Sequence, residues 1–529
     1  MWLRLPGTGQ PLKAEPMGQP YYISTAISYP NGRPHIGHAY EAIAADAIAR
    51  FQRMMGRQVY FQTGTDEHGL KMVQTARDRG VEVADLAAEM SSHFRKMDER
   101  LNISFDRFIR TTEPDHHAAS AALWDAMAAR GDLYLGRYEG WYSVRDEAFY
   151  DEKELLDGEG GQRLSPQGTP VEWTVEESWF FRLSRYQQPL LDLYRSQPSF
   201  IQPESRRNEV MRFVEGGLAD LSVSRTSFEW GVPVPGSPGH VMYVWVDALT
   251  NYLTGAGYPA PGYEARWPAD LHLIGKDIVR FHAVYWPAFL MSAGLALPRQ
   301  VFGHGFLLHR GEKMSKSVGN VVDPIELADR FGVDALRYFL LRDVVFGQDG
   351  SYSAEAIVTR VNADLANSFG NLAQRVLSFV AKNLGRVPGP GRGDPADAEL
   401  LALVARAAQE ELPAAFEQLA LSQGCEAWMR AVFACNQYVD AQAPWALRKT
   451  EPERMEAVLR TLLLAIRDLA VAIRPVIPGS ADRLLDLLGV GTDARDFAAL
   501  ADRGWIENAV LLPPAPCFPR LDLPAADPS

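Results

Sequence analysis

Near the start of the chain, a buried strand, a tight turn and a long amphipathic helix follow one another. Tyr21–Ile27 is aromatic and β-branched, as strands are, and Ser28–Pro34 contains two prolines and an Asn-Gly pair. From His35 to Met55, apolar residues recur at three- and four-residue steps, and Gly56 follows as a C-cap. A buried strand that leads into a helix is the repeating unit of doubly wound parallel sheets, so this succession predicts an α/β fold.

Two histidines, His35 and His38, lie one turn apart at the start of this helix. Free N–H groups and the positive end of the helix dipole favour a phosphate at such a position, and two imidazoles add hydrogen-bond donors. Gly37, between them, lets a nucleotide approach the main chain closely. The alternative is that both histidines lie on the surface and only cap the helix.

Lys313 and Lys316 lie far downstream in Arg310–Asn320, which has glycines near both ends and small hydroxyl residues within it. We expect a mobile loop whose ammonium groups close over a pentavalent phosphorus and neutralise charge as pyrophosphate leaves. An isolated pair of lysines more often belongs to a solvated basic loop. Together with the histidine pair, however, the lysines predict a site that holds the triphosphate of ATP during nucleotide transfer.

The composition narrows the class of protein. With 529 residues, 47% of them hydrophobic, the chain is long enough for several domains with their own cores. It contains no apolar run of membrane-spanning length, and its first residues lack a secretory signal, although either Met1 or Met17 can be the start. The formal net charge of −13 argues against nonspecific nucleic-acid binding, but it allows one folded RNA to be read by a local surface.

The three cysteines, Cys425, Cys435 and Cys517, form no close pair, which indicates a reducing compartment, most simply the bacterial cytoplasm. Because no cysteine occurs earlier in the chain, a four-cysteine zinc site is excluded there. We therefore expect no structural zinc and no other metal ligand set in the protein. An acidic cluster in the middle of the chain is interpreted as solvated surface: Asp146, Glu147 and Asp151.

The pattern of elements predicts a split α/β protein with a helical C-terminal part. We expect strands over Val59–Gly64, Met242–Ala248, Leu271–Gly275 and Gln300–His304, and long helices over Val361–Leu384, Ala396–Leu421, Gln423–Tyr438 and Pro452–Val476. After residue 130, glycines, aromatics and acidic clusters replace the βα pattern, as in an inserted β-rich or mixed region. The predicted fold is a Rossmann-like, doubly wound parallel sheet with a mid-chain insertion, followed by an all-α helical bundle.

These patterns also predict domain boundaries. We expect a flexible tail over 1–20, the first half of the sheet domain over 21–130, the insertion over 131–235, the second half with the lysine loop over 236–325, a linker over 326–365 and the helical domain over 366–529. Asp323 followed by Pro324 suits the cap and first position of the helix that begins this last, helical part.

Asp66 follows the predicted strand Val59–Gly64. Polar residues just past the carboxyl end of a parallel strand lie in the ligand crevice of a doubly wound sheet. Asp66 is therefore a candidate partner for an α-ammonium group. Since Asp is also a favoured helix N-cap, a purely structural role at the start of the next helix is the alternative.

The histidine and lysine motifs, in this order, resemble the two signatures of class I aminoacyl-tRNA synthetases, and further segments resemble the methionyl-tRNA synthetase family. These segments are Ala26–Gly32, Gly64–Gly69, Tyr243–Ala248, Ile274–His282, Val361–Asn367 and Ala443–Trp445. The similarity runs from Tyr21 to about residue 480. It implies a cytoplasmic, ATP-dependent ligase that forms methionyl-adenylate and pyrophosphate from L-methionine. Methionine then passes to the terminal adenosine of methionine tRNA, elongator and initiator alike.

The resemblance also implies which residues hold methionine. The main chain of Ile27 and the Asp66 carboxylate would bind the amino group. The residues that would surround the side chain are Tyr29, Trp245, Ala248, Leu249, Tyr252 and His282. Because a thioether sulfur is only a weak acceptor, selection must rest on shape, aromatic contact and at most one hydroxyl or imidazole donor. Some branches of the family have proline where this chain has Leu249. Without the resemblance, Trp245 and Tyr252 would be interpreted as core aromatics.

For ATP, the resemblance implies contacts with the phosphates from His35, His38, Lys313 and Lys316, and contacts with the ribose from Gly275 and Asp277. Mg²⁺ should accompany ATP, held largely by the phosphates. Arg225 occupies a position where the family has an arginine near the active site. The alternative for Arg225 is a surface ion pair.

In the helical part, the resemblance implies that Asn371, Arg375 and Trp445 read the anticodon of methionine tRNA, with the indole as a stacking platform. The linker over 326–365 would contact the tRNA stem. Taken alone, an Asn and an Arg four residues apart would be interpreted as a solvated helix face. The chain ends soon after the bundle, without the additional tRNA-binding domain of some dimeric relatives, so we expect a monomer.

Three other functions compete with this interpretation. Synthetases for valine, isoleucine or leucine carry a large editing domain, for which the insertion over 131–235 is too short. A catalytically silent relative that only binds tRNA would not need both phosphate motifs. A small-molecule nucleotidylyltransferase shares the strand and the histidine helix but has no use for a helical bundle.

Overall fold

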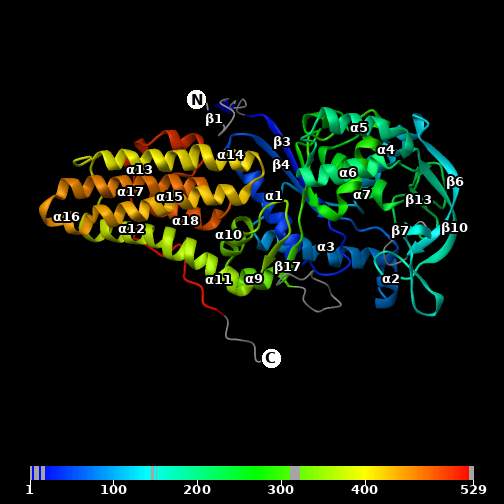
Figure 1. Ribbon diagram of the computed structural model, residues 1–529, viewed down its shortest axis with the longest axis horizontal. Helices are drawn as coiled ribbons and strands as arrows, with labels where there is room; N and C mark the ends of the chain where they lie inside the picture. The colour runs from blue at the N-terminus through cyan, green and yellow to red at the C-terminus, as the bar shows by residue number, and fades with distance from the viewer. Residues whose placement is uncertain are drawn as a thin grey trace.

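A six-stranded parallel sheet forms the centre of one half of the molecule (Figure 1). The structure, a computed structural model, describes residues 3–4, 11–12, 18–143, 148–150, 152–309 and 322–523. In their order across the sheet, the strands are β11 (Ile201–Gln202), β16 (Val301–His304), β15 (Leu271–Gly275), β3 (Pro20–Thr25), β4 (Gln58–Thr65) and β5 (Arg107–Arg110). The predicted doubly wound parallel sheet is confirmed.

The order of strands reverses at β3, which lies between β4 and β15. Ile23 pairs with Phe61 of β4 on one side and with Leu271 of β15 on the other. Its side chain is completely buried, as expected for a strand covered on both faces. In a doubly wound sheet, ligands bind beyond the carboxyl ends of the strands at such a reversal.

Different helices cover the two faces of the sheet. Ile23 packs into a core with α1 (Ile36–Met54) and α3 (Val83–Arg100). Its neighbour Tyr22 points to the opposite face, where α4 (Pro114–Ala129), α7 (Val244–Ala256) and α8 (Trp286–Ala293) form the second core. Beyond the end of α1, Gly56 adopts a φ of 86°, a left-handed conformation that suits glycine.

The inserted region contains a second, antiparallel sheet with the strand order β12-β10-β6-β7. Its strands are β6 (Leu133–Ser143), β7 (Ala148–Tyr150), β10 (Glu172–Phe181) and β12 (Leu221–Ser222), and α5 (Gln187–Ser196) and α6 (Glu204–Glu215) follow in the same region. β11, which comes from this region too, joins the edge of the main sheet by pairing Ile201 with Val301. The insertion is therefore built onto the main sheet.

Four pairs of short strands complete the β structure of the described ranges. They are β1 (Leu3–Arg4) with β2 (Pro11–Leu12), β8 (Leu156–Asp157) with β9 (Arg163–Leu164), β13 (Ser224–Arg225) with β14 (Val241–Met242), and β17 (Leu307–His309) with β18 (Gly350–Tyr352).

The predicted strand over Met242–Ala248 is wrong, because α7 begins at Val244 and β14 lies outside the main sheet. Valine and tryptophan favour strands locally, but the buried residues Val246 and Leu253 recur at helical spacing against the second core. This helix matters for function. It places four predicted pocket residues on one face: Trp245, Ala248, Leu249 and Tyr252.

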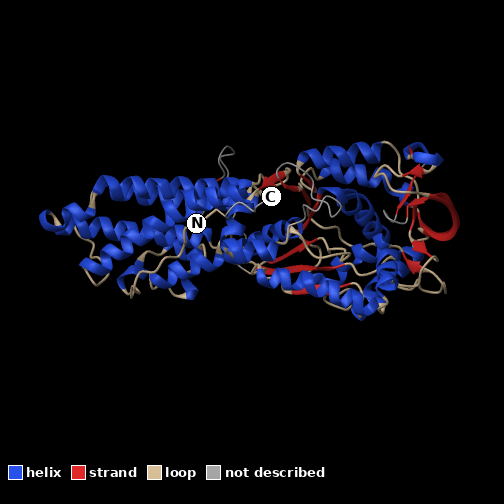
Figure 2. Ribbon diagram, turned by 90° about the horizontal axis from the view of Figure 1, so that it is seen from below, coloured by secondary structure: helices blue, strands red, loops and turns tan. Residues whose placement is uncertain are grey.

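The other half of the molecule is a helical bundle (Figures 1 and 2). Its helices, with those that lead into it, are α9 (Pro324–Phe331), α10 (Val333–Asp343), α11 (Ala354–Val361), α12 (Asn371–Asn383), α13 (Pro395–Arg406), α14 (Leu412–Glu417), α15 (Leu421–Gln442), α16 (Pro444–Thr450), α17 (Pro452–Ile473) and α18 (Pro478–Leu487). Asp323 caps α9 by accepting a hydrogen bond from the Ile325 N–H at 2.8 Å, as predicted. The helical C-terminal part is thereby confirmed.

A buried ion pair fastens the bundle to the sheet domain. Arg337 Nη2 of α10 lies 2.6 Å from Asp46 Oδ2 of α1, and neither side chain is exposed. Arg337 also donates to the carbonyls of Pro475 and Val476, between α17 and α18. Burial alone would raise the pKa of Asp46, but Arg337, Arg50 and Ser104 together outweigh it and lower that pKa. The helix that begins with the histidine pair is thus anchored from behind by the bundle.

Candidate active site

A cleft of about 530 Å³ opens beyond the carboxyl ends of β3, β4, β15 and β16, along one face of α7. Twelve of the residues predicted for methionine and ATP line it: Ile27, Tyr29, His35, His38, Asp66, Trp245, Ala248, Leu249, Tyr252, Gly275, Asp277 and His282. They come from segments that are far apart in the sequence. The fold therefore gathers them at the strand reversal where a doubly wound sheet binds ligands.

His35 and His38 close the start of α1. The His35 N–H donates to His38 Nδ1 at 3.1 Å, and the Gly37 N–H donates to His35 Nδ1 at 3.1 Å. A ring nitrogen that accepts a hydrogen bond carries no proton, so each neutral imidazole carries its proton on Nε2. His35 and His38 therefore cap the helix, as in the alternative interpretation, and they also line the cleft. Capping fixes both rings as Nε2–H donors.

Two glycines keep the main chain of the cleft accessible. A Cβ atom at Gly275, the last residue of β15, would lie 2.6 Å from Asp277 Oδ1. A Cβ atom at Gly37 would lie 2.9 Å from His35 Cε1. A side chain at either position would displace a neighbouring residue predicted for ATP. Asp277 itself is exposed at the edge of the cleft.

Asp66 forms part of the cleft wall just beyond β4. Its side chain is buried, and its main-chain N–H donates to the carbonyl of Ser28 at 2.9 Å. The next helix, α2 (Leu70–Arg79), has Gly69 as its N-cap and no side-chain cap. The alternative interpretation of Asp66 as a helix cap is therefore wrong, and Asp66 lines the cleft.

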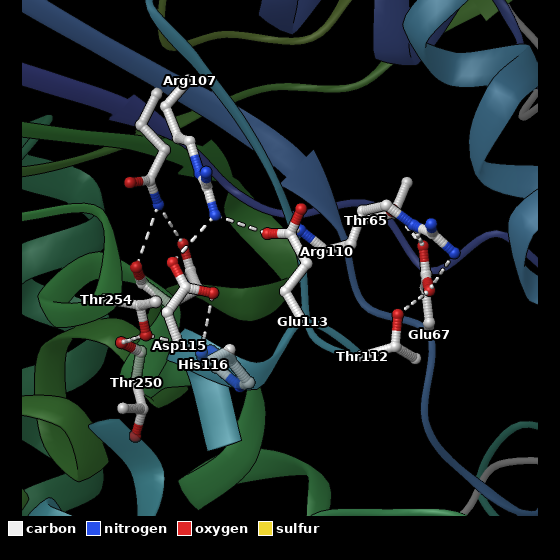
Figure 3. A network of polar contacts seen from close by, with 12 residues as sticks. Thr65, Glu67, Arg107, Arg110, Thr112, Glu113, Asp115, His116, Thr250 and Thr254 are labelled. Carbon is white, nitrogen blue, oxygen red and sulfur yellow. Dashed lines mark hydrogen bonds and ion pairs between the residues drawn. The ribbon is translucent and has the colours of Figure 1, made fainter. Parts of the chain in front are cut away.

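The neighbouring Glu67 fixes the loop that contains Asp66 (Figure 3). Its carboxylate accepts from Arg110 Nε at 2.7 Å and Nη2 at 2.9 Å, a bidentate pair. The hydroxyls of Thr65 and Thr112 donate to the same carboxylate at 3.0 and 2.7 Å. With these partners in place, the Asp66 loop is held in position before any substrate binds.

Aromatic rings build the wall of the pocket opposite this loop. Trp245 stacks on Phe281, with 3.4 Å between the ring centroids and 17° between the planes. Ala248 and Leu249 follow on the same face of α7, and Leu249 is almost completely buried. The surface they form is apolar and rigid, and it is suited to an unbranched, polarizable side chain.

Tyr252 and His282 close the pocket with a directed chain of hydrogen bonds. His282 Nδ1 lies 3.0 Å from the carbonyl of Ile278, to which it must donate. Its Nε2 then accepts from the Tyr252 hydroxyl at 2.6 Å. Burial lowers the pKa of His282 to about 4, so the ring is neutral at physiological pH. Both protons of the pair are used within the wall, which leaves shape and aromatic contact as the means of selection.

A pair that the sequence did not single out, Glu41 and His304, also lines the cleft. Glu41 Oε2 lies 2.8 Å from His304 Nε2, and His304 Nδ1 donates to the Gly305 carbonyl at 2.8 Å. Burial raises the pKa of Glu41. Burial would lower the pKa of His304, but Glu41, with the Gly305 carbonyl and Asp277, outweighs burial and raises that pKa. A hydrogen bond joins the two side chains. Glu41 follows His38 by three residues on α1, a spacing from which it could have been predicted.

Asn251 is a second residue that sequence reasoning missed. It lines the cleft, its Nδ2 donates to the Ala248 carbonyl at 2.6 Å, and its Oδ1 accepts from Gln62 Nε2 at 2.7 Å. It thus ties α7 to β4. No local pattern marks this residue, because its partner lies far away in the sequence.

Three other predicted residues are not among the described residues that line the cleft. Arg225 is absent from the described residues that line the cleft, and it is buried with its guanidinium 3.6 Å from the Tyr243 ring centroid. Its alternative, a surface ion pair, is therefore wrong, because the side chain is only 2% exposed. Lys313 and Lys316 lie outside the described residues.

In the bundle, two of the three residues predicted for the anticodon are in contact. The Arg375 guanidinium lies 5.0 Å from the Trp445 ring centroid, and Asp440 Oδ1 accepts from its Nη2 at 2.9 Å. Both line a groove of about 310 Å³, together with apolar residues of α12 and α15. Asn371 is exposed at the start of α12, one turn before Arg375.

Within the ranges that the structure describes, no three His, Cys, Asp or Glu side chains gather as a metal site. Burial raises the pKa of the thiols of Cys425 and Cys435 to about 12 and also raises that of Cys517. Asp146, Glu147 and Asp151 lie outside the described residues. None of the described helices is both long and apolar enough to cross a bilayer.

Two family models match the chain. The model for class I tRNA synthetases (M) matches residues 21–377, and the model for the anticodon-binding domain of methionyl tRNA ligase matches residues 387–503. Together the two models cover the sheet domain, the insertion and most of the bundle.

Curated relatives and solved structures agree with these models. A methionine–tRNA ligase of Brucella suis is 58% identical over 503 residues, which is 94% of this chain and 98% of the relative. A methionine–tRNA ligase of Mycobacterium tuberculosis is 58% identical over 514 residues, 96% of this chain and 99% of the relative. The structure of Mycobacterium tuberculosis methionyl-tRNA synthetase with methionyl-adenylate is 57% identical, with a TM-score of 0.91 over 95% of this chain and 100% of the other.

Proposed function

This chain belongs to the methionyl-tRNA synthetase family of class I tRNA synthetases, and on that premise we propose how its residues divide the work of a methionine–tRNA ligase. The enzyme activates L-methionine with ATP. The methionine carboxylate attacks the α-phosphorus, so that methionyl-adenylate forms and pyrophosphate leaves. A hydroxyl of the terminal adenosine of the tRNA then attacks the carbonyl carbon, and AMP leaves.

The observation that carries this assignment of roles is the arrangement of the cleft. A helix start with two Nε2–H donors lies in the same cleft as a neutral aromatic pocket, with the Asp66 carboxylate as a further wall. The helix start with its two donors suits the triphosphate of a nucleotide, and the neutral aromatic pocket suits an unbranched thioether side chain. The Asp66 carboxylate suits an α-ammonium group.

In the ATP half, His35 and His38 donate from Nε2 to phosphate oxygens, assisted by the N-terminal end of α1. Gly275 and Asp277 meet the ribose at the end of β15. Lys313 and Lys316 close over the phosphates and neutralise the charge that develops as pyrophosphate leaves. Mg²⁺ accompanies ATP, and its ligands are mainly phosphate oxygens and water.

In the methionine half, the Ile27 main chain and Asp66 bind the ammonium group. Tyr29, Ala248 and Leu249 limit the width of the pocket, and Trp245 supplies a face for the sulfur. The neutral Tyr252–His282 pair ends the pocket. Because the pair's own protons are committed, a hydroxyl or amide on a competing amino acid would lose its hydrogen bonds to water without replacement.

The groove beside Trp445 binds the anticodon of methionine tRNA. The indole stacks on an unpaired base, Arg375 stacks or donates beside it, and Asn371 offers an amide to a base edge. Initiator and elongator methionine tRNAs share this anticodon, so both are substrates. We further propose that the enzyme acts in the cytoplasm as a monomer and without structural zinc.

The test is pyrophosphate–ATP exchange on purified protein, with each standard amino acid in turn and no added zinc. Exchange that depends on methionine alone supports the assignment of the pocket. Exchange with valine, isoleucine or leucine would show that the pocket selects the amino acid of a related synthetase. Absence of exchange with all amino acids would contradict the roles given to the cleft.

A further inference from the structure

A buried carboxylate, Asp247, joins two histidines behind the cleft. Asp247 Oδ2 lies 2.6 Å from His68 Nδ1, and Oδ1 lies 2.8 Å from His116 Nε2. None of the three residues is more than 4% exposed, and none is among the described residues that line the cleft. They come from the loop after β4, from α4 and from the first turn of α7. We refer to them as the buried triad.

Hydrogen bonds orient the side chains of the buried triad; Figure 3 labels His116 with its neighbours Thr250 and Thr254. The Thr254 hydroxyl donates to the Thr250 carbonyl at 3.1 Å, so Thr254 Oγ1 accepts from His116 Nδ1 at 3.0 Å. His116 Nε2, on the other side of the ring, faces Asp247 Oδ1. Burial would raise the pKa of Asp247, but the two histidines outweigh it and hold that pKa well below its usual range. Asp247 is a carboxylate that accepts from both rings.

The buried triad connects the two sides of the amino-acid site. His68 follows Asp66 by two residues in the same loop, and Asp247 lies on α7 between Trp245 and Ala248. Any change in the distance between His68 and Asp247 moves the Asp66 carboxylate relative to the aromatic wall. Asp247 also supplies the negative charge that faces both imidazoles.

We propose that the buried triad is a positioning device for the amino-acid subsite, which sets the separation and charge of Asp66 and the α7 wall. His68, His116 and Asp247 are positioning residues, because they act through Asp66 and α7 and do not touch the cleft. This inference rests on the proposed function of the cleft. It assigns the buried triad to methionine binding and not to the chemistry at the phosphates.

The first test is Asp247→Asn, which keeps the shape of the side chain and removes its charge. We expect the KM for methionine in pyrophosphate exchange to rise about tenfold or more, the size of loss seen at metal sites when a residue that orients a ligand is changed. The KM for ATP and the kcat at saturating methionine should change by less than about threefold, because the histidine pair at the start of α1 is untouched.

A matched pair of variants separates positioning from simple loss of stability. His68→Asn keeps an N–H donor where Nδ1 stands, whereas His68→Ala removes it. We expect His68→Ala to raise the KM for methionine and His68→Asn to restore most of the affinity. As a control for buried charge, Asp397→Asn breaks the pair with Arg454 in the bundle, 2.6 Å apart, and should leave the KM for methionine unchanged.

The outcomes distinguish this inference from the proposed function. If the unaltered enzyme exchanges with methionine but Asp247→Asn keeps a normal KM, the positioning role is refuted and the function stands. A fall in kcat with both KM values unchanged, or equal behaviour of His68→Asn and His68→Ala, would also refute it. No exchange by the unaltered enzyme would refute the function first. If Asp247→Asn fails to fold, the His68 pair decides.

Discussion

The cleft and the groove beside Trp445 use aromatic side chains in opposite ways. In the cleft, Tyr252 is 1% exposed and donates to a neutral histidine, and Trp245 is fixed against Phe281. In the groove, Trp445 is 46% exposed and Arg375 rests near it, held by one exposed carboxylate. Chemistry on a small substrate needs groups that are in place beforehand, whereas an exposed ring gains its burial from the macromolecule it binds.

The two sites also differ in how they are anchored. The cleft residues come from segments spread along the sheet domain and are fixed by buried bonds such as Glu67 to Arg110. The groove is lined by residues of the bundle helices α12, α15, α16 and α17. The sites should therefore fail independently. A change in the cleft should abolish activation, and a change in the groove should spare it.

The largest effect is expected from the phosphate end of the cleft. His38→Asn keeps an acceptor for the His35 N–H but loses the Nε2–H donor, so the kcat for exchange should fall about 100-fold. His38→Gln places an amide donor near the Nε2 position and should retain much more activity. Methionine binding, followed by tryptophan fluorescence, should be similar in both variants. Equal activity of the two variants would contradict the donor role.

The second prediction concerns the stability of the folded protein at acid pH, which depends on the burial of His282 in the methionine pocket. The folded-state pKa of His282 is about 4, below the usual value of about 6.5, so between these values only the unfolded chain gains the proton. Stability is therefore lost as the pH falls through this window, by about 2 kcal/mol at pH 5. In urea unfolding, His282→Gln should lack this part of the loss. Parallel pH profiles for the two proteins would show that His282 is not neutral.

A smaller effect is expected when the Tyr252 hydroxyl is removed. Tyr252→Phe leaves His282 Nε2 buried without its donor, which costs about 1 to 3 kcal/mol. We expect the KM for methionine to rise about tenfold while the KM for ATP stays within twofold. Steady-state exchange at varied methionine and varied ATP measures both. A rise in the KM for ATP alone would contradict the assignment of Tyr252 and His282 to the methionine half of the cleft.

The smallest effect should come from the groove. Arg375→Lys keeps the charge but loses the planar group beside the indole, so the efficiency of tRNA charging should fall about three- to tenfold. Exchange should remain unchanged. Arg386→Lys, at an exposed ion pair with Glu456 elsewhere in the bundle, is the control and should charge normally. Equal losses in both variants would indicate a general charge effect.

Local patterns predicted the parts of the fold whose cause is local. The strand and helix around His35 and the cap at Asp323 have signals within a few residues, and both are present. Met242–Ala248 looked like a strand because a short apolar run does not distinguish a strand from a buried helix. Packing against the second core made it α7, and two-residue β11 is too short for any periodic signal.

The residues of the site could likewise be predicted only where a local pattern marks them. The histidine motif and the predicted methionine residues line the cleft, and Lys313 and Lys316 lie outside the described residues. Glu41 with His304 and the buried triad were missed as functional groups. Their partners stand far apart in the sequence, 263 and 179 positions for the Glu41 and His68 contacts, and only the fold brings them together. Arg225 shows the reverse case, since a motif position did not bring its side chain into the described lining of the cleft.

The independence of the two sites can be measured directly on Trp445→Ala. In one preparation, methionine-dependent exchange and the charging of methionine tRNA would be compared with those of the unaltered enzyme. Phe433→Ala, which removes another half-exposed ring from the bundle, serves as the control. We expect exchange within twofold of normal and charging reduced about 10- to 100-fold, the effect of losing one stacked base. Normal charging, or an equal fall in exchange and charging, would contradict the separation of the two sites.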